Sequence, residues 1–137
     1  MKSPDSGIRY HLINDPSITA LVDPKNIVCA DLPQEDSFPA IVCTLDSKIP
    51  ETVMNGPAGI SRSVVGVHVY GRDSNDLSGL ALVKRIGAEV SASLNCFRGS
   101  WGDMTVHGVF LEEQSDMDPD TDTSLFGISF QFVVWHS

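Results

Sequence analysis

Aspartate recurs at every second position from Asp116 to Asp122, which is how a calcium-binding loop begins. Such a loop needs glycine at its sixth position for a sharp turn and glutamate at its twelfth to complete the oxygen shell of the ion. Counted from Asp116, these positions hold Thr121 and Gly127. The spacing therefore fails the test for a calcium site, and a solvated acidic loop is the better interpretation.

The histidines and serines also lack the spacing of a catalytic or metal site. Ser61 and Ser63 lie near Gly59 and Gly66, but the chain has no G-x-S-x-G elbow and no G-x-G-x-x-G loop. No histidine has a second histidine or a cysteine at ligand spacing, which favours structural histidines over zinc ligands. The histidines are His11, His68, His107 and His136.

An acid–base pair of His107 or His136 with a carboxylate stays open. The predicted strands that carry these histidines are rich in Phe and Val, however, and such a face more often packs than catalyses. We therefore predict no catalytic residue, no cofactor and no metal, and we expect that the protein is not an enzyme.

The acidic segment is also unusual in its charge. Residues 112 to 122 carry six carboxylates and no cation, and no lysine or arginine occurs from Gly99 onward, in a chain whose net charge is −9. Such a segment cannot be buried, so it must stay solvated or face a partner. The charge disfavours nucleic acid, whose binding depends on Lys and Arg. We predict a candidate interface or pore loop that contains Glu112, Glu113, Asp116, Asp118, Asp120 and Asp122.

Length and composition predict one domain over residues 1–137, with residues 1–7 expected to be a flexible N-terminus. No apolar run approaches the roughly 18 residues that a membrane span requires. The N-terminal residues also lack the apolar centre of a signal peptide, so we expect a cytoplasmic protein with no membrane contact. Cys29, Cys43 and Cys96 are odd in number and widely spaced, which favours reduced, partly buried thiols over a disulfide framework.

The acidic segment and two of the histidines must be positioned by the last part of the chain. This part predicts a β-hairpin, with one strand over 105–111 and another over 125–134. In the second strand every other residue from Phe126 to Val134 is apolar, including Phe130 and Phe132, which predicts one buried face. The acidic segment is expected to be the long exposed loop between the two strands.

Upstream of this hairpin, the pattern predicts a helix over 3–14, a short turn over 17–22 and strands over 27–30, 40–45 and 60–70. The turn at 55–59 should make the last two of these strands antiparallel. An apolar stripe from Gly79 to Leu94 predicts the main amphipathic helix near 75–95. The fold class is therefore α+β, an antiparallel-rich sheet of about five strands with this helix and the short N-terminal helix packed on it.

Several segments in register resemble the tail-completion proteins of long-tailed phages and prophages. They are Leu32-Pro-Gln34 with Pro39-Ala-Ile-Val42, then Asn55-Gly56, Phe97-Arg-Gly99, Val106-His-Gly-Val-Phe-Leu-Glu112 and the ending Ser129-Phe-Gln-Phe-Val-Val-Trp-His136. The resemblance runs in order from about residue 8 to residue 136.

This resemblance implies a fold related to the tail terminator of phage lambda and a structural protein that completes the tail tube. It further implies a homo-oligomeric ring, typically a hexamer, whose partners are the tail tube protein and the head–tail connector proteins. The expected location is the bacterial cytoplasm during assembly and the virion tail if the phage is active. The resemblance assigns no chemical role to an individual residue.

Two other interpretations remain open at this point. One is a small cytoplasmic interaction domain whose acidic loop binds a basic partner unrelated to any virion. The other is a metal-dependent enzyme that uses the aspartates from Asp116 to Asp122, which would require a cleft with converging groups. Oligomeric state measured against concentration would separate the ring from the first of these.

Overall fold

The computed structural model describes residues 3–29, 39–53, 56–72, 78–116 and 125–137; for residues 47–53 and 56–58 it describes the backbone only. The helical elements are α1 (Pro4–Ile13), α2 (Pro16–Thr19), the 3-10 helix η1 (Pro24–Asn26) and α3 (Gly79–Leu94). The strands are β1 (Ile27–Cys29), β2 (Ala40–Val53), β3 (Gly56–Arg72), β4 (Gly99–Trp101), β5 (Met104–Asp116) and β6 (Leu125–His136). No helix in this described part is both long and apolar enough to cross a membrane.

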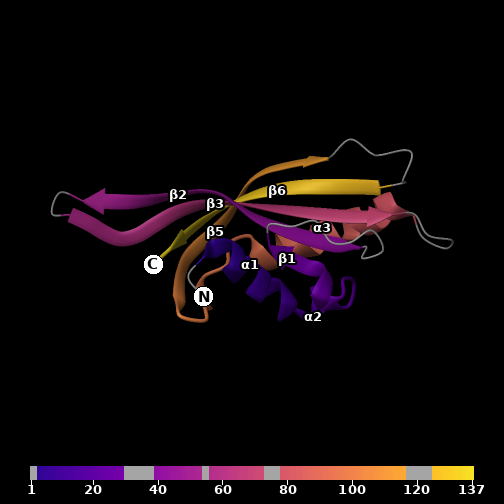
Figure 1. The fold of residues 1–137 in the computed structure, drawn as a ribbon, viewed down its shortest axis with the longest axis horizontal. Coiled ribbons are helices and arrows are strands. Elements are labelled where there is room, and N and C mark those ends of the chain that lie inside the picture. Colours follow the sequence, from indigo (N-terminus) through magenta and orange to yellow (C-terminus); the bar gives the residue numbers. More distant parts are fainter. Residues whose placement is uncertain (1–2, 30–38, 54–55, 73–77, 117–124) are drawn as a thin grey trace.

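The strands form one sheet in the order β1-β2-β3-β6-β5-β4, and Figure 1 shows α1, α2 and α3 together on one of its faces. β1 runs parallel to β2, whereas the other neighbouring strands are antiparallel. The predicted α+β class with an antiparallel-rich sheet is confirmed. Among the described residues the sheet has six strands rather than about five, because β4, which the sequence pattern did not predict, pairs with the start of β5.

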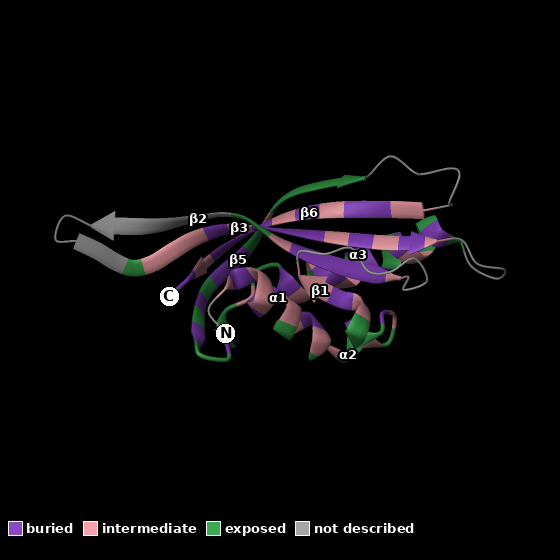
Figure 2. Cartoon of the chain, viewed as in Figure 1, coloured by how far each residue is buried: buried purple, intermediate pink, exposed green. Residues whose placement is uncertain are grey.

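β6 lies at the centre of the sheet and supplies much of the core. Ile128, Phe130, Phe132 and Val134 are all at most 2% exposed, and they alternate with residues of the opposite face. Pairing with β3 on one side and β5 on the other satisfies the backbone of this strand. The predicted buried face is therefore confirmed, and Figure 2 shows burial concentrated where the strands meet the helices.

α3 covers this core through the predicted stripe, since Val83, Ile86, Val90 and Leu94 are fully buried. Its helix begins after Ser78, whose hydroxyl accepts a hydrogen bond from the Ala81 amide, as is common at helix N-termini. The helix packs closely on β6: a Cβ atom added at Gly87 would lie 3.0 Å from the Phe130 ring. A larger residue at position 87 would require Phe130 to shift by a few tenths of an ångström.

The other boundaries differ modestly from expectation. β2 continues eight residues beyond Leu45, to Val53, and β3 starts at Gly56, within the stretch predicted as a turn. Backbone pairing of Val53 with Gly56 makes the connection shorter and the strands longer than the apolar pattern indicated. At the N-terminus, residues 4–7, expected to be flexible, form the first turn of α1.

Candidate functional site

The predicted acidic loop is in part a strand. β5 runs through Glu112 and Glu113 to Asp116, five residues beyond the predicted end, whereas Asp118, Asp120 and Asp122 lie outside the described residues. The expectation of a loop from residue 112 was wrong, because this segment pairs its backbone with residues 128–131 of β6 while its side chains remain exposed. Carboxylate side chains do not prevent a segment from forming a strand when all of them stay exposed to solvent.

The strand distributes its acidic side chains over different surroundings. Asp116 lies with Gln114 on the side of the sheet that α3 covers, and Glu113 lies with Ser115 on the opposite face. Glu112 stands 3.8 Å from the guanidinium of Arg62, and both side chains are substantially solvated. The described carboxylates therefore form no single patch, and in the described part of the chain no three His, Cys, Asp or Glu side chains could hold a metal ion together.

The outer edge of β5 is covered only in its first half. β4 pairs with residues 104–106, and the Val109 amide and carbonyl bond to the segment that follows α3. The Leu111 amide then donates to the side chain of Asn95 at 3.0 Å. Among the described residues, no strand covers this edge from 112 to 116, and an uncovered strand edge is a template for pairing with another chain.

The hairpin of β2 and β3 leaves a second free edge. β1 covers β2 only at residues 41–43, and β6 reaches along β3 only as far as Ser61. The distal parts of the two strands, residues 51–53 and 56–60, therefore pair only with one another within the described chain. We call these two segments the arm; Figure 1 shows the arm at the left of the molecule, beyond the helices. A two-stranded ribbon alone in water is only marginally stable.

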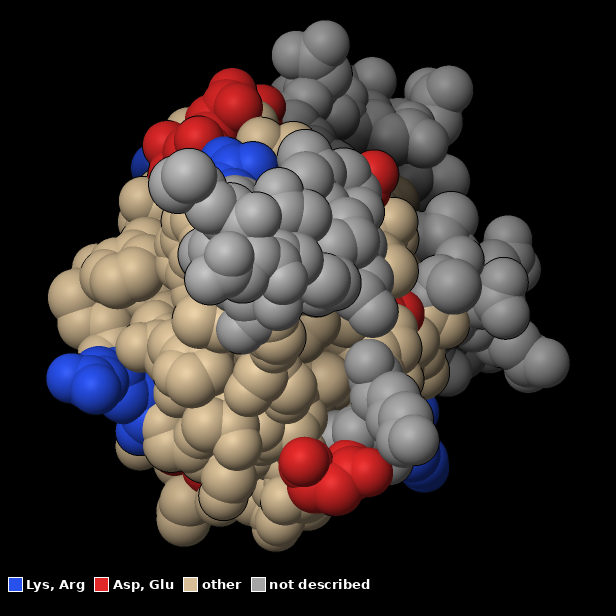
Figure 3. All heavy atoms as spheres, turned by 90° about the vertical axis from the view of Figure 1, so that its left-hand side faces the viewer, with Lys and Arg blue, Asp and Glu red and all other residues tan. Residues whose placement is uncertain are grey.

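The described charged side chains at the arm end of the molecule do not gather into one patch. Figure 3 views this end and shows the described acidic and basic side chains in small groups around its margin. Lysine and arginine do not gather into a track on the described part of this face. The described part of this surface therefore offers no continuous row of cations for a phosphate backbone.

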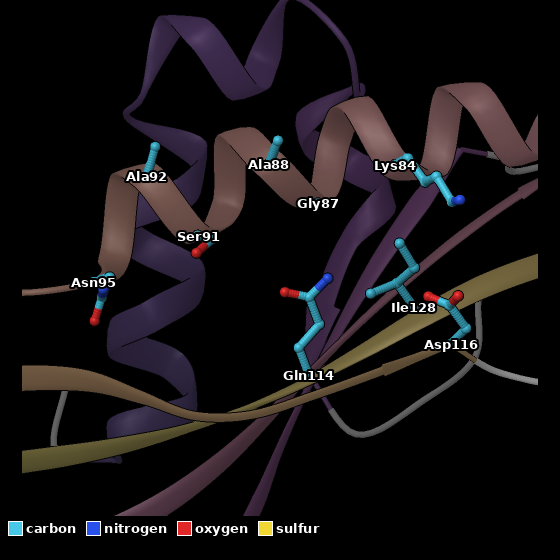
Figure 4. Close-up of a pocket in the computed structure, with 9 residues that line it drawn as sticks. All are labelled: Lys84, Gly87, Ala88, Ser91, Ala92, Asn95, Gln114, Asp116 and Ile128. Atoms are coloured by element: carbon cyan, nitrogen blue, oxygen red, sulfur yellow. The ribbon is translucent and has the colours of Figure 1, made fainter.

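An open groove of about 780 Å³ lies between α3 and the strands β5 and β6. In Figure 4, Ser91 of α3 and Gln114 of β5 point toward one another across it, whereas Ala88 and Ala92 point away from the strands. Small residues on the helix keep the groove wide, and it runs beside the free edge of β5. The residues that line it are Lys84, Gly87, Ala88, Ser91, Ala92, Asn95, Gln114, Asp116 and Ile128.

The opposite face of the sheet carries a polar network centred on His68. Its Nδ1 lies 2.9 Å from the Ser129 hydroxyl and its Nε2 lies 3.3 Å from the Thr44 hydroxyl, which in turn donates to Asp46. Burial lowers the pKa of His68, against the opposing charge of Asp46. Gly66 makes room for this network, because a Cβ there would come 2.6 Å from the Thr44 oxygen. The network bridges β2, β3 and β6.

A second network joins the helices to one another. His11 on α1 bonds through Nε2 to the carbonyl and hydroxyl of Ser93 on α3, and that hydroxyl donates to Asp15. Phe97 and Trp101 pack on the same imidazole. The hydrogen bond from Ser93 is the main cause of the lowered pKa of Asp15, and burial lowers the pKa of His11. The grouping was not visible in the sequence, because its members are up to 90 residues apart.

The remaining histidines also have structural surroundings. His136 bonds through Nε2 to the Ser63 hydroxyl at 2.8 Å, and both residues are almost fully buried. His107 is exposed on β5, 3.1 Å from the hydroxyl of Ser137. These contacts give the geometry of packing, whereas a catalytic site would need a cleft with converging groups.

Comparison with solved structures shows that this fold occurs in another protein. A chain of the structure described as "Virion of native gene transfer agent (GTA) particle" superposes with a TM-score of 0.71, over 96% of this chain and 92% of that one. The two sequences are 15% identical, so the likeness shows a shared fold. A comparison with curated proteins gave no significant match.

The sequence itself identifies the family. The model of the family Tail completion protein gp17 matches residues 6–137, nearly the whole chain, and the chain belongs to that family. This confirms the resemblance drawn from the separate segments. The protein is accordingly a bacteriophage-type tail-completion protein with a structural role in the tail.

Proposed function

We propose that this protein completes the tail tube as a closed ring of six copies and helps to join the tail to the head. Membership of the tail-completion family over residues 6–137 is the observation that carries the proposal. Its partners would then be other copies of itself, the tail tube protein and the head–tail connector proteins. Assembly would take place in the bacterial cytoplasm, and the ring would remain in the virion tail. The role is structural rather than catalytic.

The distribution of uncovered surfaces supports a ring. A rotational ring uses a heterologous contact, in which one surface of each copy meets a different surface of the next. The arm lies at one end of the molecule, whereas the groove beside α3 and the free edge of β5 belong to another part of the sheet. We propose that the arm of one copy lies against the groove and the β5 edge of the next, where each covers backbone that the other leaves free.

The acidic residues fit the same arrangement. We propose that Glu112, Glu113 and Asp116, together with Asp118, Asp120 and Asp122, face either the neighbouring copy or the pore. A pore that passes DNA should not hold it, and a carboxylate lining offers no cations for phosphate. Affinity for DNA is therefore not part of the proposed function.

A pair of substitutions on α3 tests the contact. Ser91→Arg places a long charged side chain in the groove, whereas Ala81→Arg adds the same charge at an exposed position of the same helix that does not line the groove. We expect Ser91→Arg to abolish ring formation on purified tail tubes and Ala81→Arg to retain it, as seen by electron microscopy and by mass measurement in solution. Rings formed equally by both variants would refute the groove contact.

A failure of the wild-type protein to associate at all would have a wider meaning. If it remained a monomer at every concentration and also in the presence of tail tubes, the ring would lose its support. The acidic interaction domain with an unrelated basic partner would then be the better account.

A further inference from the structure

Two of the three cysteines are neighbours in the fold, although the chain separates them by fourteen positions. Cys29 of β1 and Cys43 of β2 are direct partners in the parallel pairing of these strands. Residues in register on adjacent strands point to the same face of a sheet. Cys43 is fully buried and Cys29 is half-buried, and the two thiols are close enough to influence each other's pKa.

The distance between these positions suits a covalent link. Adjacent strands lie about 4.8 Å apart, and a disulfide joins residues whose Cα atoms are roughly 4.4 to 6.8 Å apart. Two register partners on one face therefore need little backbone movement to form a bond. The third thiol, Cys96, is exposed at the end of α3 and is not a register partner of either cysteine.

The surroundings shift the pKa values of the two thiols in opposite directions. The hydrogen bond from Cys43 is the largest cause that lowers the pKa of Cys29 to about 7, assisted by Ser6 and by the charge of Arg9 on α1. Asp5 and burial act in the opposite direction. The hydrogen bond to Cys29 and its own burial raise the pKa of Cys43. Cys29 is thus the thiol that ionises more readily and the more accessible of the two, and the nucleophile in thiol exchange is the thiolate.

We propose that Cys29 and Cys43 are a redox-active pair, which a small-molecule disulfide converts to an intramolecular disulfide between β1 and β2. The Cys29 thiolate attacks one sulfur of the small disulfide, whose sulfur–sulfur bond breaks and releases one small thiolate. Cys43 then gives its proton to water and attacks the Cys29 sulfur, which expels the second small thiolate. Two protein thiols are oxidised and one small disulfide is reduced to two thiols.

The bond would fasten a short strand at the edge of the sheet. β1 has three residues and pairs only with β2 in the described chain, while α1 packs against both strands. Under the proposed function, a virion protein leaves a reducing cytoplasm for an oxidising medium, where such a bond is stable. That setting rests on the proposed function, whereas the thiol chemistry can be measured on the isolated subunit.

The test uses the full chain with Cys96→Ser, which leaves only the two paired thiols. The reduced protein is incubated with oxidised glutathione, and its mass and free thiols are measured without reductant. We expect both thiols to disappear with the loss of two hydrogens and no retained glutathione, and a cross-linked peptide that contains Cys29 and Cys43. A lasting glutathione adduct on Cys29 beside a free Cys43 would overturn the proposal, as would two thiols that stay free.

Two further variants in the same background keep this result interpretable. Cys29→Ser alters the half-buried position and should leave Cys43 free and unreactive in the folded protein. Cys43→Ala removes the second nucleophile and should trap the glutathione adduct on Cys29. If Cys43→Ala fails to fold, as shown by its circular dichroism spectrum, Cys29→Ser alone decides the outcome, because reaction of Cys43 in that variant would contradict the assigned order of attack.

Discussion

The indole nitrogen of Trp101 donates a hydrogen bond to Nδ1 of His11 across 3.2 Å. Because Nδ1 accepts this bond, the imidazole is neutral and its proton is on Nε2, which faces the carbonyl of Ser93 at 3.1 Å. The hydroxyl of Ser93 then donates to Asp15, the residue that caps α2. One imidazole thus connects α1, α2, α3 and β4.

This bond predicts a loss of stability on acidification. Protonation of His11 at Nδ1 would remove its acceptor for Trp101, and burial lowers the pKa of His11 below 6.5 in the folded chain. The unfolded chain therefore binds more protons just below pH 6.5, so the free energy of unfolding should fall as the pH falls from 6.5 toward the lowered pKa. The lowered pKa of His68 acts with the same sign.

Urea denaturation between pH 5 and 7.5 measures this dependence. In His11→Gln the amide cannot titrate, so the slope of stability against pH should be smaller than in the wild type, and His68→Gln should remove a separate part of it. Asp15, whose pKa is lowered from 3.8, contributes only at more acidic pH. Equal slopes in the wild type and in both variants would show that neither histidine is responsible.

A second prediction concerns the contact of Gly7 with the same tryptophan. A Cβ at position 7 would lie 2.4 Å from Cε3 of Trp101, whose ring is 1% exposed and stacked on Phe97. Gly7→Ala should therefore destabilise the protein by about 1 to 3 kcal/mol, although alanine favours the helix by roughly 1 kcal/mol. The measurement is chemical denaturation. In a Trp101→Leu background, where the ring is gone, the same change should cost clearly less.

The core of β6 gives a prediction with an internal control. Phe130→Ala should lower the free energy of unfolding by about 3 to 5 kcal/mol, because the side chain is almost fully buried beneath Gly87. Phe110 is 48% exposed on β5, so Phe110→Ala should cost less than about 1 kcal/mol. Denaturant midpoints of both variants test this, and a similar loss for the two would contradict the assignment of faces.

The sequence alone predicts the surroundings of some of these residues and not of others. The period-2 pattern around Phe130 predicted both the strand and its buried face, because alternation is a local property. The extent of β5 past Leu111 was missed, since it depends on backbone pairing with β6 and not on side-chain type. The contacts of Trp101 with His11, and of Cys29 with Cys43, arise from strand order and helix placement, which no short pattern encodes.

Hydrogen exchange provides a test of the free edge of β5. We expect the backbone amides of residues 112–116 to exchange faster in the free subunit than those of the covered part of the strand around Val109. In the proposed ring they should become protected, because a neighbouring copy would then cover this edge. Mass spectrometry of exchanged peptides can compare both forms. Equal protection in the free and the assembled protein would exclude this edge from the contact.

The last prediction concerns the salt dependence of assembly. Six copies with a charge of −9 each bring together roughly −54, and repulsion among exposed carboxylates is screened over about 10 Å at 0.1 M salt. Association should therefore strengthen as salt is added or when magnesium is present. At higher salt it should level off, once ion pairs made by Lys84, Arg85 or Arg98 across the contact are screened as well.

Mass photometry or sedimentation, across protein concentration at low salt, at high salt and with magnesium, measures this trend. The variant Glu112→Gln with Glu113→Gln removes two charges per copy, both exposed. It should associate more strongly than the wild type at low salt and about equally at high salt, because screening then replaces the substitution. Association that weakens steadily with salt from the lowest concentration would instead indicate attraction between opposite charges, and the acidic residues would then have to face a basic surface of the neighbouring copy.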